Sequence, residues 1–125
     1  VVDTWTEKVQ PDTVRVGDET PLTLDAYQQQ AKVTAVYPDD KAREYLVAGL
    51  AGEVGELASL FAKHWRGDGD LNHDHAIAEL GDVLWFVAML AKELGYDISD
   101  VAQNNLNKLA DRANRGKLKG NGDNR

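Results

Sequence analysis

Two pairs of acidic residues stand at helical spacing in the middle of the chain. Glu53 and Glu56 form the first pair, and Glu79 and Asp82 form the second. Residues three apart on an α-helix project from one side as neighbours. If the two segments are helices that pack together, the four carboxylates converge and repel one another unless a cation lies between them. Carboxylate oxygens without cysteine or suitably spaced histidine favour Mg²⁺ or Mn²⁺ over Zn²⁺.

The surroundings distinguish the two pairs. A Glu-x-x-Glu pattern by itself is typical of a solvated helix face, although Glu53 borders the apolar stripe of its segment. Glu79 and Asp82 are followed by the apolar run 83–91. An ionised carboxylate in such surroundings costs several kcal/mol unless a cation or a set of donors compensates for it. The second pair is therefore the stronger indication of a metal site.

Basic and amide side chains gather on one flank of the last periodic segment. They fall within a sector of about 80° beside the expected apolar stripe, and they are Asn105, Lys108, Arg112 and Arg115. A solvated basic edge helped by the helix dipole is the simpler interpretation of this flank alone. Next to a carboxylate metal site, phosphate binding becomes the better one, because a metal ion and cations together bind and cleave polyphosphates.

Composition excludes several classes of function. The chain has 125 residues, with 14 Lys and Arg against 21 Asp and Glu, a net charge of −7. This charge argues against a sequence-independent grip on nucleic acid and against attraction to an anionic membrane. Residues 108–125 carry +4 and the remainder −11. The absence of cysteine excludes disulfides and thiolate chemistry. Because no uninterrupted apolar run approaches the roughly 18 residues of a membrane span, we expect a cytoplasmic protein.

Four helical segments must position these groups. The periodicity predicts helices over about 23–36, 41–65, 74–94 and from 97 or 99 to 116. Thr23 is the expected N-cap of the first helix, Pro38 follows its end, and the segment 67–70 breaks the chain after the second. With no convincing strand, the pattern predicts an all-α domain over 22–116, an extended arm over 1–21 and a polar basic tail over 117–125.

The third helix is expected to be apolar on almost every side. One chain of this size has too little bulk to cover all of it, so a partner chain should. We therefore expect at least a homodimer.

Three stretches resemble the MazG-type nucleoside triphosphate pyrophosphohydrolases. They are Leu50-Ala51-Gly52-Glu53-Val54-Gly55-Glu56-Leu57-Ala58, Glu79-Leu80-Gly81-Asp82-Val83-Leu84-Trp85-Phe86, and Asn105-Leu106-Asn107-Lys108-Leu109 with Arg112 and Arg115-Gly116. The family pattern is Glu-x-x-Glu followed at some distance by Glu-x-x-Asp, and all four acids are present. The resemblance begins at about Leu22 and includes the tail Gly120-Asn121-Gly122-Asp123. It implies a four-helix MazG-like bundle assembled as a dimer or dimer of dimers, Mg²⁺ dependence, and hydrolysis of a (deoxy)nucleoside triphosphate to the monophosphate and pyrophosphate.

This resemblance suggests a role for each group. Glu53, Glu56, Glu79 and Asp82 are the expected ligands of Mg²⁺, and Glu53 or Glu56 is the expected base for a water that attacks the α-phosphorus. The expected substrate contacts are Asn105, Lys108, Arg112, Arg115, Lys63 and Trp65. Trp85 and Phe86 are further candidates for stacking on the base, although such aromatics are more often core residues.

Other interpretations fit less well. Asp68, Asp70, Asn72 and Glu79 match positions 1, 3, 5 and 12 of a calcium loop, but His73 stands where that loop needs glycine. A ferritin-like di-iron bundle needs Glu-x-x-His, which neither acidic pair provides. The three histidines are expected on the surface or in loops. A dUTP-type or phosphoribosyl-ATP hydrolase of the same superfold remains open, and so does a non-catalytic helical dimer that binds divalent ions.

Overall fold

The computed structural model describes residues 20–124, and every regular element in this range is helical. The α-helices are α1 (Leu24–Ala31), α2 (Ala42–Arg66), α3 (His73–Glu93) and α4 (Ile98–Asn114). Two short 3-10 turns, η3 (Lys32–Thr34) and η4 (Asp39–Lys41), connect α1 to α2. The predicted all-α class is confirmed for these residues. Nearly all of the predicted extended arm over 1–21 lies outside them.

The first helix begins where predicted but ends earlier. The Thr23 side chain accepts a hydrogen bond from the Ala26 N–H at 3.1 Å, which is the expected N-cap. The prediction that this helix continues to about residue 36 is wrong, since α1 ends at Ala31 and tightens into η3. Thr34 Oγ1 donates to the Ala31 carbonyl at 2.6 Å, in competition with a helical backbone bond. Because β-branched residues also follow Ala31, the helix is weak there.

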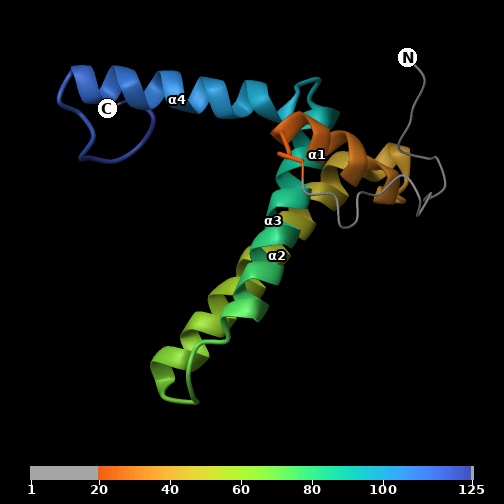
Figure 1. Ribbon diagram of the computed structural model, residues 1–125, viewed down its shortest axis with the longest axis vertical. Coiled ribbons are helices and arrows are strands. Elements are labelled where there is room, and N and C mark those ends of the chain that lie inside the picture. Colours follow the sequence, from red (N-terminus) through yellow and green to blue (C-terminus); the bar gives the residue numbers. More distant parts are fainter. Residues whose placement is uncertain (1–19, 125) are drawn as a thin grey trace.

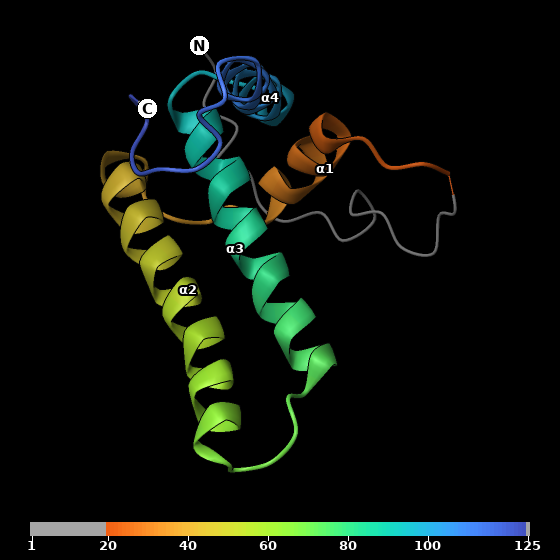
Figure 2. The same ribbon diagram turned by 90° about the vertical axis from the view of Figure 1, so that its left-hand side faces the viewer.

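Helices α2 and α3 form a long antiparallel hairpin (Figures 1 and 2). Gly67 ends α2 in the left-handed region at φ 97°, which a residue with a side chain adopts only under strain. Asn72 caps α3 by accepting from the His75 N–H at 3.1 Å. At the other end of the hairpin a Cβ on Gly49 would overlap the Phe86 ring, so a glycine is what lets the two helices approach there.

The core lies where α1 crosses the open end of this hairpin. Its buried members come from α2, α3, the start of α4 and the α1–α2 connection, and they are Ala35, Tyr37, Ala42, Leu46, Phe86, Ala88, Met89 and Ile98, against which Tyr27 and Ala31 of α1 pack. Gln28 of α1 is buried among them and is fully paired. Its amide donates to the Ala88 carbonyl at 2.9 Å and to the Tyr96 carbonyl at 3.3 Å, and its oxygen accepts from the Ile98 N–H at 3.1 Å. This one side chain therefore joins α1 to α3 and to the start of α4.

Helix α4 leaves the end of the hairpin at a steep angle instead of packing along it (Figures 1 and 2). Of the apolar stripe expected on α4, Ile98 is buried, but Leu106 is 59% exposed and Leu109 is 38% exposed. The described residues of one chain therefore leave most of this predicted apolar stripe exposed. Physically, a helix that projects from the core can cover its apolar face only against another molecule.

Candidate functional site

Three of the four predicted metal ligands meet on the hairpin. One carboxylate oxygen each from Glu53 of α2 and from Glu79 and Asp82 of α3 lies within 4.8 Å of the others. Antiparallel packing brings the middle of α2 level with the first half of α3, and the helical spacing turns the two α3 acids to the same side. Glu79 is buried at 7% exposure, Glu53 is half-buried and Asp82 is exposed. The cluster therefore runs from the interior of the hairpin to its surface.

The electrostatics of this cluster favour a cation. Burial raises the pKa of Glu53, and hydrogen bonding with Glu79 and the charges of Asp82, Glu79 and Glu56 raise it further. A divalent cation among these oxygens would remove the repulsion and hold all three groups ionised. The donor set consists of hard oxygen ligands, which suits Mg²⁺ or Mn²⁺. The residues present therefore fit the predicted metal.

Glu56 lies beside the cluster and not within it. It lines a pocket of about 350 Å³, together with Gly52, Gly55, Ser59, Leu60, Lys63, His75 and Glu79. A Cβ on Gly52 or Gly55 would meet nothing within 4 Å, so the space next to the acids is open. Lys63, one of the expected substrate contacts, places a cation in the same pocket. A ligand bound in this pocket would contact Glu56 of α2, Glu79 of α3 and the ammonium group of Lys63.

Two further residues belong to this neighbourhood and were not predicted. The His75 Nε2 atom lies 3.1 Å from Glu79 Oε1, and the His75 side chain lines the pocket. Its spacing of four residues before Glu79 is the sequence signal for this pair. Tyr27 of α1 is the second, since burial and then the charge of Asp82 raise the pKa of its hydroxyl. No sequence pattern connects Tyr27 with the acids, because only the crossing of α1 over the hairpin brings it close.

The aromatic candidates occupy different environments. Phe86 is a core residue at 8% exposure. The Trp85 indole donates to Thr34 Oγ1 at 2.8 Å, and its ring stands edge-on to Phe86. Trp65 is 77% exposed near the end of α2, with its ring centroid 5.6 Å from that of Phe61. Of these three rings, Trp65 is the most accessible to a nucleobase.

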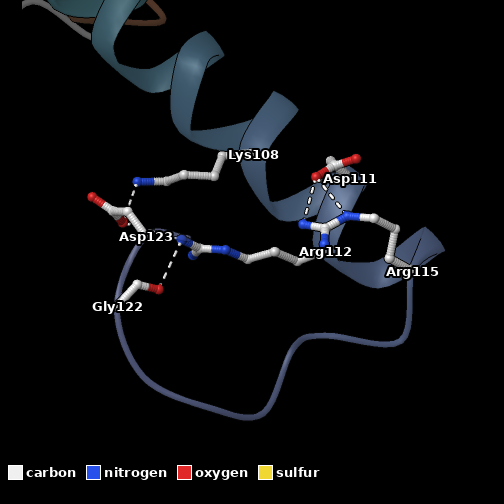
Figure 3. Close-up of polar contacts among 6 residues, drawn as sticks. All are labelled: Lys108, Asp111, Arg112, Arg115, Gly122 and Asp123. Carbon is white, nitrogen blue, oxygen red and sulfur yellow. Dashed lines mark hydrogen bonds and ion pairs between the residues drawn. The ribbon is translucent and has the colours of Figure 1, made fainter. Parts of the chain in front are cut away.

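The predicted basic flank is present on α4, but its cations are already paired with acids (Figure 3). Lys108 and Arg112 both bind the Asp123 carboxylate of the tail. Arg115 pairs with Asp111 one turn earlier, at 2.8 Å. Asn105 and Lys108 line a second, open pocket of about 400 Å³, with Tyr96, Val101 and Asn104.

Within one chain, the basic flank and the acidic cluster are far apart. Asp82 is eleven residues before the end of α3, a distance of roughly 17 Å along that helix. Lys108 then lies ten residues into α4, roughly 15 Å further along an axis that diverges from the hairpin (Figure 1). A triphosphate bound at the acids therefore does not reach the basic flank of the same chain.

Comparison with known proteins places these residues in a family. Residues 41–116 match the model of the MazG nucleotide pyrophosphohydrolase domain. The range includes both acidic pairs and the basic flank of α4. The Gene 37 protein of Mycobacterium phage L5 is 45% identical over an alignment of 114 residues, and the match covers 83% of this chain and 100% of that protein. No solved structure matches the chain significantly.

Proposed function

Because the chain belongs to the MazG nucleotide pyrophosphohydrolase family, we propose that it hydrolyses a (deoxy)nucleoside triphosphate to the monophosphate and pyrophosphate. The observation that carries this proposal is the cluster of Glu53, Glu79 and Asp82 beside a pocket that also holds Lys63. Acidic groups at a pocket with a cation are the arrangement that hydrolysis of a phosphoric anhydride requires.

The acids of the hairpin have separate tasks in this proposal. Glu53, Glu79 and Asp82 would hold Mg²⁺, with Mn²⁺ as the alternative. When bound, the ion supplies charge neutralisation for the phosphates and lowers the pKa of a water. The hydrogen bond between His75 and Glu79 orients the Glu79 carboxylate, as partners of metal ligands commonly do.

Glu56 is the better candidate for the general base. It is exposed in the pocket and stands outside the three-carboxylate cluster, so its oxygens are available to a water. That water attacks the α-phosphorus, its proton passes to Glu56, and the bond from the α-phosphorus to the bridging oxygen breaks as pyrophosphate leaves. Lys63 would contact the phosphate chain, and Trp65 would stack on the base.

The basic flank takes part in this reaction only if a second copy of the chain brings it to the acids. Asn105, Lys108, Arg112 and Arg115 lie on α4, whose axis diverges from the hairpin of the same chain (Figure 1). Exposed apolar residues on α4, and on the hairpin at Val54, Ile77 and Leu80, offer surfaces for such a copy. We therefore propose a homodimer or dimer of dimers in which the basic flank of one protomer completes the pocket of the other.

The cytoplasm is the proposed location. By length and composition alone the range 39–66 could cross a membrane, with a mean hydropathy of 1.3 in its best window. The core helix of a water-soluble protein passes the same test, although only 6% of this window is buried among the described residues. Glu53 and Glu56 lie in the middle of this range, where a lipid environment would penalise both charges.

A product analysis in labelled water tests the reaction. We expect a panel of deoxynucleoside and ribonucleoside triphosphates with Mg²⁺ to yield pyrophosphate and no inorganic phosphate, with a chelator abolishing turnover. In H₂¹⁸O, attack at the α-phosphorus places the label in the monophosphate. Label in pyrophosphate, or release of inorganic phosphate, would contradict the proposal. Activity on dUTP or phosphoribosyl-ATP alone would select the corresponding branch of the superfold.

Single substitutions test the acids. Glu79→Gln, Asp82→Asn and Glu56→Gln should each lower kcat by about a hundredfold or more, because each removes a charge that acts in the transition state. Glu44→Gln is the matched control, since Glu44 is an exposed glutamate in the first turn of the same α2 helix. Full activity of Glu79→Gln with an intact fold would remove the basis of the assignment.

A further inference from the structure

The C-terminal tail folds back onto α4 and ends on the basic flank (Figure 3). Asp123 Oδ1 accepts hydrogen bonds from Lys108 Nζ at 2.9 Å and from an Arg112 terminal nitrogen at 3.1 Å. The same Arg112 nitrogen donates to the Gly122 carbonyl at 3.3 Å. One carboxylate oxygen thus bridges Lys108 and Arg112, two cations of the basic flank that are expected to bind phosphate.

Burial is uneven across this contact. The Arg112 side chain is only 5% exposed, whereas the Asp123 side chain is 79% exposed. The Nε atom of Arg112 is buried and has no hydrogen-bond partner among the described residues. A guanidinium has five donors in a planar fork, which matches an anion with several oxygens. The tail therefore covers the Arg112 guanidinium but leaves its buried Nε–H without a hydrogen-bond acceptor among the described residues.

We propose that Asp123 is an internal substitute for a phosphate group, which the outer phosphates of the substrate displace from Lys108 and Arg112. The proposal rests on the proposed function and adds to it a tail that must open when a polyphosphate binds. A phosphate carries more charge and more acceptor oxygens than a carboxylate, so it is the stronger ligand for the pair. The Lys108–Asp123 pair is exposed at both ends, and such pairs contribute little to stability, whereas the buried Arg112 needs another anion when Asp123 leaves.

The exchange is driven by a competing anion and not by protonation. Hydrogen bonds from Lys108 and then Arg112 hold the pKa of Asp123 below the usual aspartate range. The carboxylate is therefore ionised throughout the neutral pH range, and only another anion can take its place.

Calorimetric titration of inorganic pyrophosphate into the full chain tests the displacement. Asp123→Asn should bind pyrophosphate about twofold to fivefold more tightly than the unmodified chain, because the competing charge is gone. Asp123→Glu keeps the charge and should stay closer to the unmodified chain. Asp68→Asn is the control, since it removes another ion-paired aspartate, the partner of Arg66 in the α2–α3 turn, and should leave affinity unchanged. Lys108→Met should weaken binding.

Hydrogen exchange of residues 117–124 is the second measurement. Pyrophosphate should accelerate exchange in this segment if the tail leaves. Unchanged or slower exchange, or equal or weaker affinity in Asp123→Asn, would overturn the proposal and make Asp123 a structural clamp on α4.

These titrations do not depend on turnover. Mg²⁺-dependent hydrolysis together with an unresponsive tail would refute only the displacement, whereas a responsive tail without hydrolysis would refute only the proposed reaction.

Discussion

At the scale of single residues, the acidic cluster is held in an unfavourable arrangement. Glu53, Glu79 and Asp82 stand close together at the edge of an apolar hairpin, and burial, followed by the neighbouring acids, raises the pKa of Glu53. Packing of α2 against α3 imposes this proximity, so the protein bears the repulsion whenever no cation is bound. The same repulsion would favour binding of an ion of high positive charge.

Glu53→Gln should raise the melting temperature of the metal-free protein at neutral pH. The folded-state pKa of Glu53 is raised, so the folded state binds more protons than the unfolded state between the two pKa values. The penalty is therefore full above the folded-state pKa and disappears below the ordinary glutamate value. We expect the difference between variant and unmodified protein to shrink as the pH falls through this window.

The measurement is thermal unfolding with a chelator from pH 7.5 to pH 4, with Glu44→Gln as the control. Added Mg²⁺ should reverse the order, since the unmodified protein gains more from the ion than the variant does. A variant that melts below the unmodified protein at every pH without metal would show that Glu53 is a favourable structural contact.

At the scale of the elements, a single polar side chain decides how the helices join. Gln28 is 1% exposed. Its amide nitrogen donates to backbone carbonyls of α3 and of the α3–α4 connection, and its amide oxygen accepts from the first backbone N–H of α4. Asp25, one turn earlier, accepts from the Ser99 N–H at 2.9 Å and from the Ser99 hydroxyl at 2.6 Å. The α1 helix therefore sets the direction in which α4 leaves the core.

Gln28→Ala should lower the free energy of unfolding by about 2 to 4 kcal/mol, because it removes a buried side chain and strands the buried groups that it pairs. Gln29→Ala is the matched control, since Gln29 is exposed on the same helix and should change stability little. Urea denaturation at one protein concentration measures both. Equal stability of the two variants would mean that water replaces the Gln28 amide without cost.

At the scale of the whole molecule, two features of the described residues bear on the proposed homodimer. The α4 helix carries apolar residues along a face that contacts little of its own chain. The acids lie on the α2–α3 hairpin, whereas the basic flank lies on α4, which diverges from that hairpin (Figure 1). In the proposed homodimer, a second copy packed against α4 would cover its apolar face and bring a basic flank to the acids.

Leu106→Lys should therefore shift the protein toward the monomer and reduce turnover. A lysine at this 59% exposed position keeps the isolated chain soluble but places a charge in the proposed interface. Sedimentation at micromolar concentration measures the association, and Val36→Lys is the control because Val36 is 71% exposed in the α1–α2 connection. A folded 13.7 kDa monomer for the unmodified chain would contradict the assembly.

Local rules determined much of this protein from sequence alone. Helical periodicity placed α2, α3 and α4 to within a few residues, and the i, i+3 spacing put Glu79 and Asp82 on one side of α3. Neither inference depends on contacts between residues that are far apart in the sequence. The end of α1 at Ala31 was not predicted, because there a side-chain hydrogen bond from Thr34 competes with the backbone hydrogen bonds of the helix.

Only the tertiary structure decided which of the predicted groups meet. The register of α2 against α3 brings Glu53 to the other two acids and leaves Glu56 at the pocket, although all four share the same spacing in sequence. The direction of α4 separates Lys108 and Arg112 from those acids, and the returning tail places Asp123 on both cations. Periodicity specifies the face of each helix but not the angle between helices, which depends on contacts such as those of Gln28 between residues sixty to seventy positions apart.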